Sequence, residues 1–251
     1  MQNNAVLPAQ SIFVLVHSAI TGPGIWEPAA DALEQMGFQT LVPHLPYNLD
    51  PPQPFWENHA AAAAEALAHV PPEAPLFLTG HSGAGLLLPC IRQLVDRAAA
   101  GYIFVDSSLP ETGVSRLDHL EEELPGGAEP VYKALEAGEL LPRWSDEDLS
   151  AEIGDARLRL AVIQDLRPHP LRYYTEPIPV FNGWPDAPCA YLHFSRSSSY
   201  EIPSARARQA GLPFCRLPGG HFHLLVNPQE TARTLVELAG ELLSSGAAST
   251  R

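Results

Sequence analysis

A serine that stands in a tight turn between two apolar runs is the residue best placed to do chemistry in this sequence. Leu76–Thr79 is apolar and of strand length, and residues 80–84 that follow it have the sequence GHSGA. A G-x-S-x-G turn between a strand and a helix holds its serine in a strained conformation that exposes the hydroxyl. The flanking positions must be small, which Gly80 and Ala84 satisfy, although glycine is commoner than alanine at the second position. Ser82 is therefore the candidate nucleophile, and an incidental serine in a glycine-rich turn is the alternative.

A serine hydroxyl is a poor nucleophile at neutral pH and needs a base within hydrogen-bond reach. His221 lies in the glycine-bearing loop 217–223, between the last predicted strand and the last predicted helix. A histidine at this position would project over the edge of the sheet from which Ser82 rises. His223 is a nearby competitor, but the Gly-Gly-His order favours His221 as the base.

A carboxylate that orients the imidazole would complete this arrangement. Asp106 directly follows the predicted strand Tyr102–Val105, whereas Glu201 comes several residues after the predicted strand Ala190–Phe194. Asp106 is favoured, because Glu201 could reach the histidine only through a longer loop. Both stay open, since Asp106 could be a turn or capping residue and Glu201 a solvated surface charge.

Two backbone N–H groups are needed to stabilise the oxyanion that forms when a serine attacks a carbonyl. The Gly83 N–H, at the start of the helix after the turn, is free to supply one. The loop 17–24 after the first predicted strand is placed to supply the other from Ala19, and Gly22 and Gly24 let its backbone fold close to the serine.

Predicted strands and helices alternate along most of the chain. The strands are expected at Ser11–Val16, Thr40–Val42, Leu76–Thr79, Tyr102–Val105, Ala190–Phe194 and Pro213–Leu217, and the helices at Trp26–Met36, Phe55–His69, Gly83–Arg97 and from Asn227 to about Leu243. This alternation predicts an α/β fold with a mostly parallel sheet that helices cover on both faces.

One long stretch, residues 109–188, interrupts this alternation. It has no strand-like apolar run, and it carries an acidic patch at residues 118–123, then helical pieces and a proline-rich end. Its many large apolar residues argue against a disordered linker, and an insertion of this length is more typical of a lid. We therefore expect a core of residues 1–108 and 186–251, with a helical cap of residues 109–185 inserted between two strands.

Composition narrows the classes of function. The net charge of −14 argues against nucleic acid and anionic membranes as partners, and no apolar stretch is long enough to span a bilayer. An N-terminus without a signal peptide and three cysteines indicate a cytoplasmic protein with reduced thiols. No cysteine–histidine cluster has metal-ligand spacing, so neither a metal nor a cofactor is expected. A single lysine with much Ala, Pro and Arg suggests a bacterial source. The sequence leaves open whether the protein forms a homodimer.

Taken together, these residues resemble the α/β-hydrolase superfamily. The N-terminal part is most similar to the branch that holds plant methyl-ester esterases and hydroxynitrile lyases, whose members carry a V-H-G-A loop and a tryptophan nine residues after its histidine. Here residues 16–19 have the sequence VHSA, and Trp26 follows at that spacing. The resemblance covers roughly residues 11–108 and 186–240.

The resemblance implies Ser82 as nucleophile, His221 as base, and Ala19 and Gly83 as oxyanion donors. The chain departs from the family pattern at three points. Serine replaces the usual glycine at position 18, alanine replaces a glycine at position 84, and the loop after the Ala190–Phe194 strand lacks the acid usual there.

These observations favour a serine hydrolase, of carboxylesterase type, that cleaves a small or medium apolar ester, thioester or lactone through an acyl-enzyme. One alternative is lyase, cyclase or acyl-transfer chemistry on the same residues, although lyases of this branch favour a lysine near the site and the only lysine here is Lys133. The other is a ligand-binding protein on a hydrolase scaffold, which the absent acid supports.

Overall fold

The centre of the molecule is a six-stranded sheet in which every pair of neighbouring strands is parallel. The computed structural model describes residues 7–248 of the chain. The strand order is β2-β1-β3-β4-β7-β8, with bounds β1 Ile12–Val16, β2 Gln39–Leu41, β3 Leu76–Ser82, β4 Gly101–Ser107, β7 Cys189–Phe194 and β8 Phe214–Leu217. The α/β fold class expected from the sequence is confirmed.

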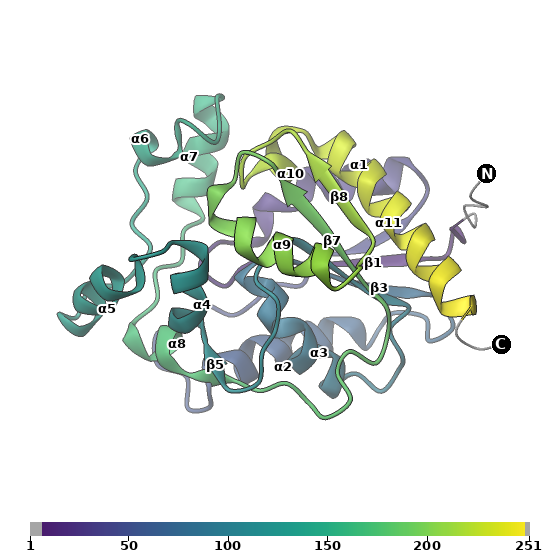
Figure 1. Ribbon diagram of the computed structural model, residues 1–251, viewed down its shortest axis with the longest axis horizontal. Coiled ribbons are helices and arrows are strands. Elements are labelled where there is room, and N and C mark those ends of the chain that lie inside the picture. Colours follow the sequence, from purple (N-terminus) through teal and green to yellow (C-terminus); the bar gives the residue numbers. More distant parts are fainter. Residues whose placement is uncertain (1–6, 249–251) are drawn as a thin grey trace.

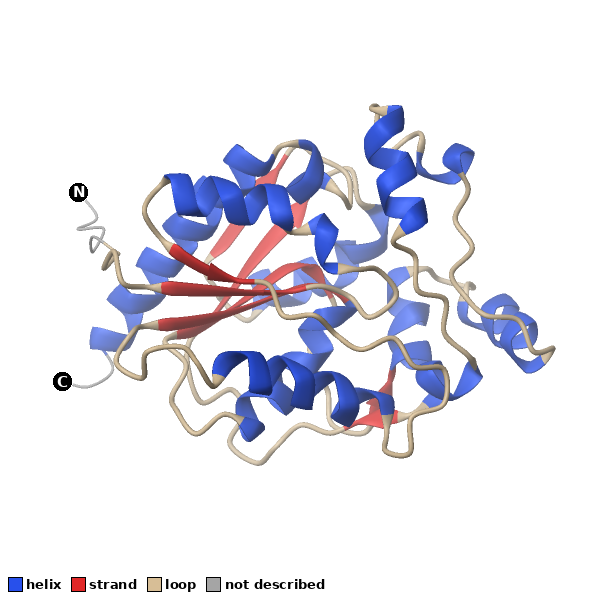
Figure 2. Cartoon of the chain, turned by 180° about the vertical axis from the view of Figure 1, so that it is seen from behind, coloured by secondary structure: helices blue, strands red, loops and turns tan. Residues whose placement is uncertain are grey.

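Helices cover both faces of the sheet, as Figure 2 shows. One face carries α1 (Glu27–Gln35), α10 (His223–Val226) and α11 (Pro228–Ala248), and the other carries α2 (Phe55–Leu67), α3 (Leu88–Leu94) and α9 (Glu201–Gln209). Short 3₁₀ turns add η1 (Pro23–Ile25), η2 (Gly83–Leu87) and η3 (Ser198–Tyr200).

The strand residues divide between these two layers with the two-residue period of a β-strand. In β4, Ile103 and Val105 pack with α1 and α11, whereas Tyr102 and Phe104 pack with α2 and α3. Because both faces are buried, the strands are apolar without alternation, which is the pattern that predicted them from the sequence.

The segment between β4 and β7 forms a separate group of elements, which lies to the left of the sheet in Figure 1. Its elements are β5 Val114–Ser115, α4 Arg116–Glu123, α5 Ala128–Glu136, α6 Asp146–Leu149, α7 Ala156–Gln164, α8 Leu171–Thr175 and β6 Pro177–Ile178. The antiparallel pair β5–β6 was not expected, because two residues are too few to give a strand pattern. We call residues 109–185 the inserted segment.

The helix expected over Gly83–Arg97 is broken into a 3₁₀ turn and a shorter α-helix. Pro89 lacks the N–H that would bond to the carbonyl four residues earlier, so the chain turns as η2 before α3 begins at Leu88. The α-helix ends at Leu94, after which Val95 is extended. The last helix, in contrast, runs past the expected end at Leu243 to Ala248.

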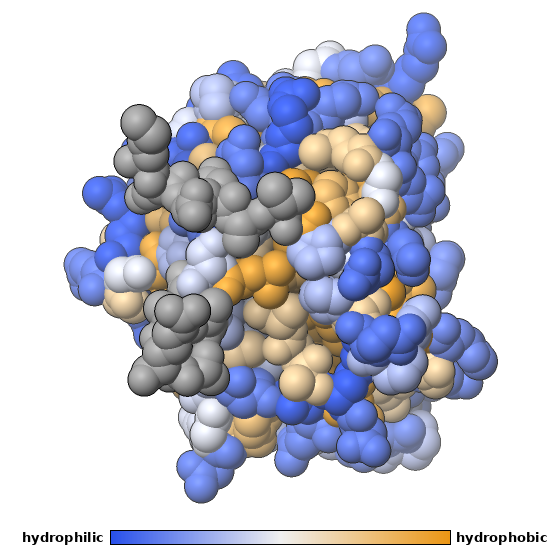
Figure 3. All heavy atoms as spheres, turned by 90° about the vertical axis from the view of Figure 1, so that its right-hand side faces the viewer, coloured by the Kyte–Doolittle hydropathy of each residue, from blue (hydrophilic) through white to orange (hydrophobic). Residues whose placement is uncertain are grey.

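Both ends of the described chain lie away from the inserted segment (Figure 1). Figure 3 shows this end of the molecule, where hydrophilic side chains surround smaller groups of apolar ones. Within residues 7–248, no helix combines the length and apolar character needed to cross a bilayer.

Gly80 allows a close approach that a side chain would prevent. A Cβ at this position would lie 2.8 Å from the Gly85 backbone nitrogen and 2.9 Å from its Cα. We expect Gly80→Ala to lower the free energy of unfolding by about 1–3 kcal/mol, measured by urea denaturation, because backbone must move to admit the methyl group. Gly154→Ala is the control, since its Cβ would meet no atom within 4 Å; equal effects of the two substitutions would contradict this reasoning.

Candidate active site

Ser82 lies at the end of β3 in the strained conformation that the turn motif predicts. Its φ of 59° and ψ of −134° are rare for a residue with a side chain and cost on the order of 1–3 kcal/mol. Ser107 in β4 holds the turn by donating a hydrogen bond to the Ser82 carbonyl. The sequence did not indicate that Gly85 is also required, although a Cβ there would overlap the Ser107 hydroxyl.

The loop after β1 lies beside Ser82. His17 fixes this loop by donating from Nδ1 to the Ser18 carbonyl (2.8 Å) and accepting at Nε2 from the Leu45 N–H (3.4 Å). Burial lowers the pKa of His17 to about 4, so the ring is neutral and can hold both bonds. Ser18 and Ile20, which flank Ala19, line a small cavity of about 10 Å³ together with Ser82.

Gly83, the other predicted oxyanion donor, is the first residue of η2. The first N–H groups of a helix have no partner within the helix. Ala19 and Gly83 therefore lie on the two backbone segments that adjoin Ser82.

His221 follows β8, and its ring, its backbone N–H and its carbonyl each have a hydrogen-bond partner. Its Nδ1–H donates to Asp106 Oδ2 over 2.7 Å, its backbone N–H donates to Glu152 Oε2 over 2.6 Å, and its carbonyl accepts from His81 Nε2 over 2.9 Å. The ring stacks on His81 at 4.4 Å and on Tyr200 at 5.0 Å between centroids. With 16% of its side chain exposed, His221 reaches the cavity that Ser82 also lines.

His223, the competing histidine, is directed elsewhere. It begins α10, and its Nε2 lies 2.8 Å from Glu230 Oε2 in α11. It lines neither of the two cavities, of about 330 and 10 Å³, in whose walls Ser82 lies. The structure therefore brings His221, and not His223, to the candidate site.

Asp106 occupies a β-bulge at the end of β4. His81 pairs with Val105 and Ser82 pairs with Ser107, so Asp106 is the extra residue, and its φ is 44°. A bulge redirects a side chain relative to the regular alternation of the strand. Here it turns the carboxylate of Asp106, which is fully buried, toward the loop that carries His221.

The buried carboxylate of Asp106 is kept ionised by the donors around it. It accepts hydrogen bonds from His193 Nδ1 (3.0 Å), the Phe194 N–H (3.2 Å) and His221 Nδ1. Burial acts to raise the pKa of Asp106, but the hydrogen bonds from His193 and His221 outweigh it and hold the pKa below its usual value.

Glu201, the other candidate acid, does not contact His221. It lies at the start of α9 with 53% of its side chain exposed, and it bonds to Arg216 at 2.9 Å. Its Oε1 is 3.4 Å from His193 Nε2, and the other ring nitrogen of His193 bonds to Asp106, so His193 lies between the two acids.

Two features of this site were missed in the sequence. Tyr200 is the first: its hydroxyl lies 3.0 Å from Ser82 Oγ. It follows a run of serines without any motif that marks it. The second is a buried ion pair between Arg116 and Glu123, bidentate at 2.9 and 2.7 Å, whose carboxylate also accepts from the Ser108 hydroxyl.

Glu123, one of the acidic residues noted at positions 118–123, is thus paired inside the protein. Arg116 and Glu123 are both buried. Burial acts to lower the pKa of Arg116, but the charge of Glu123 outweighs it, so the pKa is raised and the guanidinium stays charged. The seven-residue spacing, which places both residues on one helix face, is the signal that could have revealed the pair.

A cavity of about 330 Å³ opens in front of Ser82 and His221. Its polar lining residues are Ser82, Arg116, Glu123, Arg143, Ser199, Tyr200 and His221. The remaining walls are mostly apolar and come largely from the inserted segment, with Leu120, Leu124, Val131, Leu141, Pro142, Trp144 and Tyr174. Cavities of this volume hold small organic molecules.

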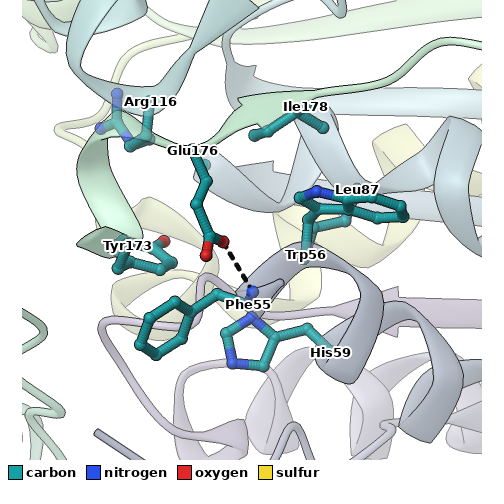
Figure 4. A pocket seen from close by; sticks show the side chains of 9 residues that line it. Phe55, Trp56, His59, Leu87, Arg116, Tyr173, Glu176 and Ile178 are labelled. Carbon is teal, nitrogen blue, oxygen red and sulfur yellow. Dashed lines mark hydrogen bonds between the residues drawn. The ribbon is translucent and has the colours of Figure 1, made fainter. Parts of the chain in front are cut away.

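Arg116 also lines a second, smaller cavity, which Figure 4 shows. Glu176 reaches across it and accepts a hydrogen bond of 2.7 Å from the Phe55 N–H at the start of α2. Its volume of about 20 Å³ is room for about one water molecule, so it is too small for a substrate. No cluster of three or more potential metal ligands occurs among residues 7–248.

We expect the Arg116–Glu123 pair to be costly to break on one side. Glu123→Ala should lower the free energy of unfolding by roughly 3–5 kcal/mol, because Arg116 would be left as an uncompensated buried charge. The double variant Arg116→Met with Glu123→Leu should recover most of that loss. Thermal and urea unfolding measure both, and a double variant less stable than Glu123→Ala would contradict this reading.

Four buried histidines should make stability fall in weak acid. Burial lowers the pKa of His17 and His169 to about 4 and that of His59 and His81 to about 3. The unfolded chain binds protons at these residues below pH 6.5, whereas the folded chain does not until pH 3–4. The free energy of unfolding should therefore decrease as the pH falls from 6.5 toward 4, with each histidine contributing on the order of 1 kcal/mol per pH unit.

Urea unfolding at a series of pH values tests this prediction. His59→Leu should flatten the pH dependence between pH 6 and 4.5 by about one proton, since one histidine no longer titrates on unfolding. An unchanged slope in this variant would show that His59 is protonated in the folded chain.

We compared the chain with protein families and with solved structures. A family model described as the alpha/beta hydrolase family matches residues 13–234. Among curated proteins, no sequence matches the chain. An extracellular α/β-hydrolase from a Paenibacillus species, described as sharing structural and functional homology with tobacco salicylic acid binding protein 2, has a TM-score of 0.75 at 16% identity, over 91% of this chain and 98% of its own.

Two further solved structures have the same fold. A pyrethroid hydrolase from Sphingobium faniae has a TM-score of 0.66 at 19% identity, over 91% of this chain and 97% of its own. Polyneuridine aldehyde esterase has a TM-score of 0.66 at 17% identity, over 92% of this chain and 99% of its own. At such low sequence identity, these structural matches show only a shared fold. The family model, in contrast, matches most of the sequence. The resemblance found in the sequence is thus confirmed, and the chain belongs to the alpha/beta hydrolase family.

Proposed function

We propose that this α/β-hydrolase is a serine hydrolase, of carboxylesterase type, in which Ser82 is the nucleophile, His221 the base and Asp106 the orienting acid. The observation that carries the proposal is the 2.7 Å hydrogen bond from His221 Nδ1 to the buried Asp106, beside a cavity that Ser82 and His221 both line. A carboxylate accepts only, so Nδ1 carries the proton and Nε2 is left with a lone pair.

The reaction then proceeds through an acyl-enzyme. As Ser82 Oγ attacks the ester carbonyl, its proton passes to His221 Nε2, and the N–H groups of Ala19 and Gly83 stabilise the oxyanion. The tetrahedral intermediate collapses, and His221 returns the proton to the leaving oxygen. Water, activated by the same histidine, releases the acyl group and restores Ser82.

The cavity supports a small or medium apolar acyl substrate in an ester, thioester or lactone. Its walls are mostly apolar, and the guanidinium of Arg116 is neutralised by Glu123. Arg143, which also lines the cavity, is mostly exposed and pairs with Glu139. A negatively charged substrate group buried beside the Arg116–Glu123 pair would have no free positive charge of Arg116 to compensate it. We assign the inserted segment, residues 109–185, as the cap that supplies these walls and keeps water from the site.

The residues around Ser82 favour neither alternative function. The binding-protein alternative depended on the missing acid, a gap that Asp106 fills in the proposed site. The lyase alternative would be favoured by a lysine near the site, but Lys133 is mostly exposed and pairs with Glu129 on α5. Two of the structural neighbours, an esterase and a hydrolase, also favour hydrolysis.

A fluorophosphonate probe with peptide mapping tests the proposal directly. We expect one adduct, on Ser82, and hydrolysis of a panel of short-chain esters and thioesters. Ser82→Ala should abolish the adduct and lower kcat by at least about 10³-fold, because the covalent route is lost. No adduct on folded protein, or full turnover by Ser82→Ala, would refute the assignment.

A matched pair of variants in the same assay separates the two candidate acids. Asp106→Asn should lower kcat by roughly 10³- to 10⁴-fold, since the amide no longer fixes the tautomer of His221. Glu201→Gln should change kcat little, because Glu201 does not contact His221. The reverse ranking would assign the acid to Glu201.

A further inference from the structure

Tyr200 places a hydroxyl beside the atom that reacts in the proposed mechanism. It ends the η3 turn after β7, its side chain is only 3% exposed, and its hydroxyl oxygen is 3.0 Å from Ser82 Oγ. Its ring stacks on His221 with an interplanar angle of 16°, and it lines the 330 Å³ cavity. The loop after β7 is where the family usually carries its acid, and here it carries this tyrosine.

The direction of the Tyr200–Ser82 hydrogen bond follows from the protons available. Burial, together with the negative charge of Glu123, raises the pKa of Tyr200, so the phenol keeps its proton. The single hydroxyl proton of Ser82 must point to His221 Nε2 for attack to begin. Tyr200 is therefore the donor and Ser82 Oγ the acceptor.

A second buried tyrosine, Tyr191, differs from Tyr200 in the partners of its hydroxyl. The Tyr191 hydroxyl is buried between the backbone groups of Ser107, accepting from its N–H at 3.0 Å and donating to its carbonyl at 2.6 Å. Tyr191 is thus a structural residue of the core. Tyr200, in contrast, faces the cavity and donates to a side-chain oxygen that becomes acylated.

We propose that Tyr200 is a further catalytic residue, whose hydroxyl donates a hydrogen bond first to Ser82 Oγ and then to the leaving-group oxygen of the substrate. This inference rests on the proposed serine-hydrolase function. Once Oγ is bonded to the acyl carbon it is a weak acceptor, and the leaving oxygen on the same carbon becomes the stronger acceptor next to Tyr200.

The step balances without any proton leaving Tyr200. The bond from Ser82 Oγ to the carbonyl carbon forms as the Oγ proton moves to His221 Nε2. When the carbon–oxygen bond to the leaving group breaks, its electron pair stays on the leaving oxygen, which takes the proton from His221. The Tyr200 O–H bond stays intact and stabilises the charge that develops on that oxygen.

The test compares two esters of the same acid, one with an alkyl alcohol and one with p-nitrophenol as leaving group. An alkoxide needs stabilisation to leave, whereas p-nitrophenolate does not. Tyr200→Phe should therefore lower kcat/KM for the alkyl ester roughly 10- to 100-fold, the range for a hydrogen bond to a developing charge. The value for the p-nitrophenyl ester should change less than about threefold.

Tyr102→Phe is the matched control, because it also removes the hydroxyl of a buried tyrosine that bonds to a side chain, that of Asp186. Tyr102 lies near the start of β4, whereas Asp106 and the candidate site lie at the end of this strand. This control should leave the ratio of the two rates unchanged. Equal losses for both esters in Tyr200→Phe would overturn the proposal, because a residue that only holds Ser82 or the fold affects both. No loss for the alkyl ester would overturn it as well.

Two further measurements keep the result decisive. If Tyr200→Phe does not fold, a trifluorotyrosine at position 200 keeps the shape but donates more strongly. It should raise the alkyl-ester rate relative to the p-nitrophenyl rate; an unchanged ratio would refute the proposal.

Fluorophosphonate labelling of the unmodified protein separates the serine-hydrolase function from the role of Tyr200. Absence of labelling and of turnover refutes the serine-hydrolase function and this proposal with it, whereas labelling with an unaltered leaving-group dependence refutes only the role of Tyr200.

Discussion

The hydrogen bond between Asp106 and His221 is the contact on which the rest of the site depends. A carboxylate with no exposed surface is costly unless it is fully bonded, and the bulge in β4, the Phe194 N–H and His193 together supply the partners. Asp106 itself has a positive φ of 44° at this bulge. Without this contact the imidazole of His221 would lack a fixed tautomer, and the proposed mechanism would have no oriented base for Ser82.

The inserted segment is joined to the sheet by electrostatics as well as by apolar packing. Arg116 begins α4 and Glu123 ends it, so each charge opposes the helix dipole at its own end. The helix does not gain from this arrangement, whereas the interface does, because Glu123 also binds Ser108 just after β4. The pair therefore fixes the position of α4 against the strand that carries Asp106.

Local sequence signals were sufficient for the sheet and for the turn at Ser82, because apolar runs and small residues specify both without help from distant parts of the chain. The two acids were left open, since the bulge that turns Asp106 toward His221 arises from the register of β3 with β4, which no single segment encodes. Tyr200 and Glu123 were missed for the same reason. Their environments are set by the packing of η3 and α4 against the cavity. In sequence alone a glutamate suggests an exposed position, and a tyrosine can be buried or exposed.

The contact between Glu152 and the backbone of His221 links two parts of the molecule that a cap would separate on opening. Glu152 belongs to the inserted segment, and its carboxylate fills the space where a side chain at position 220 would lie. A displacement of this segment away from the sheet would remove the acceptor of the His221 N–H and loosen the glycine-rich loop around it. The position of the inserted segment and the conformation of the loop that carries His221 are therefore coupled through this one backbone hydrogen bond.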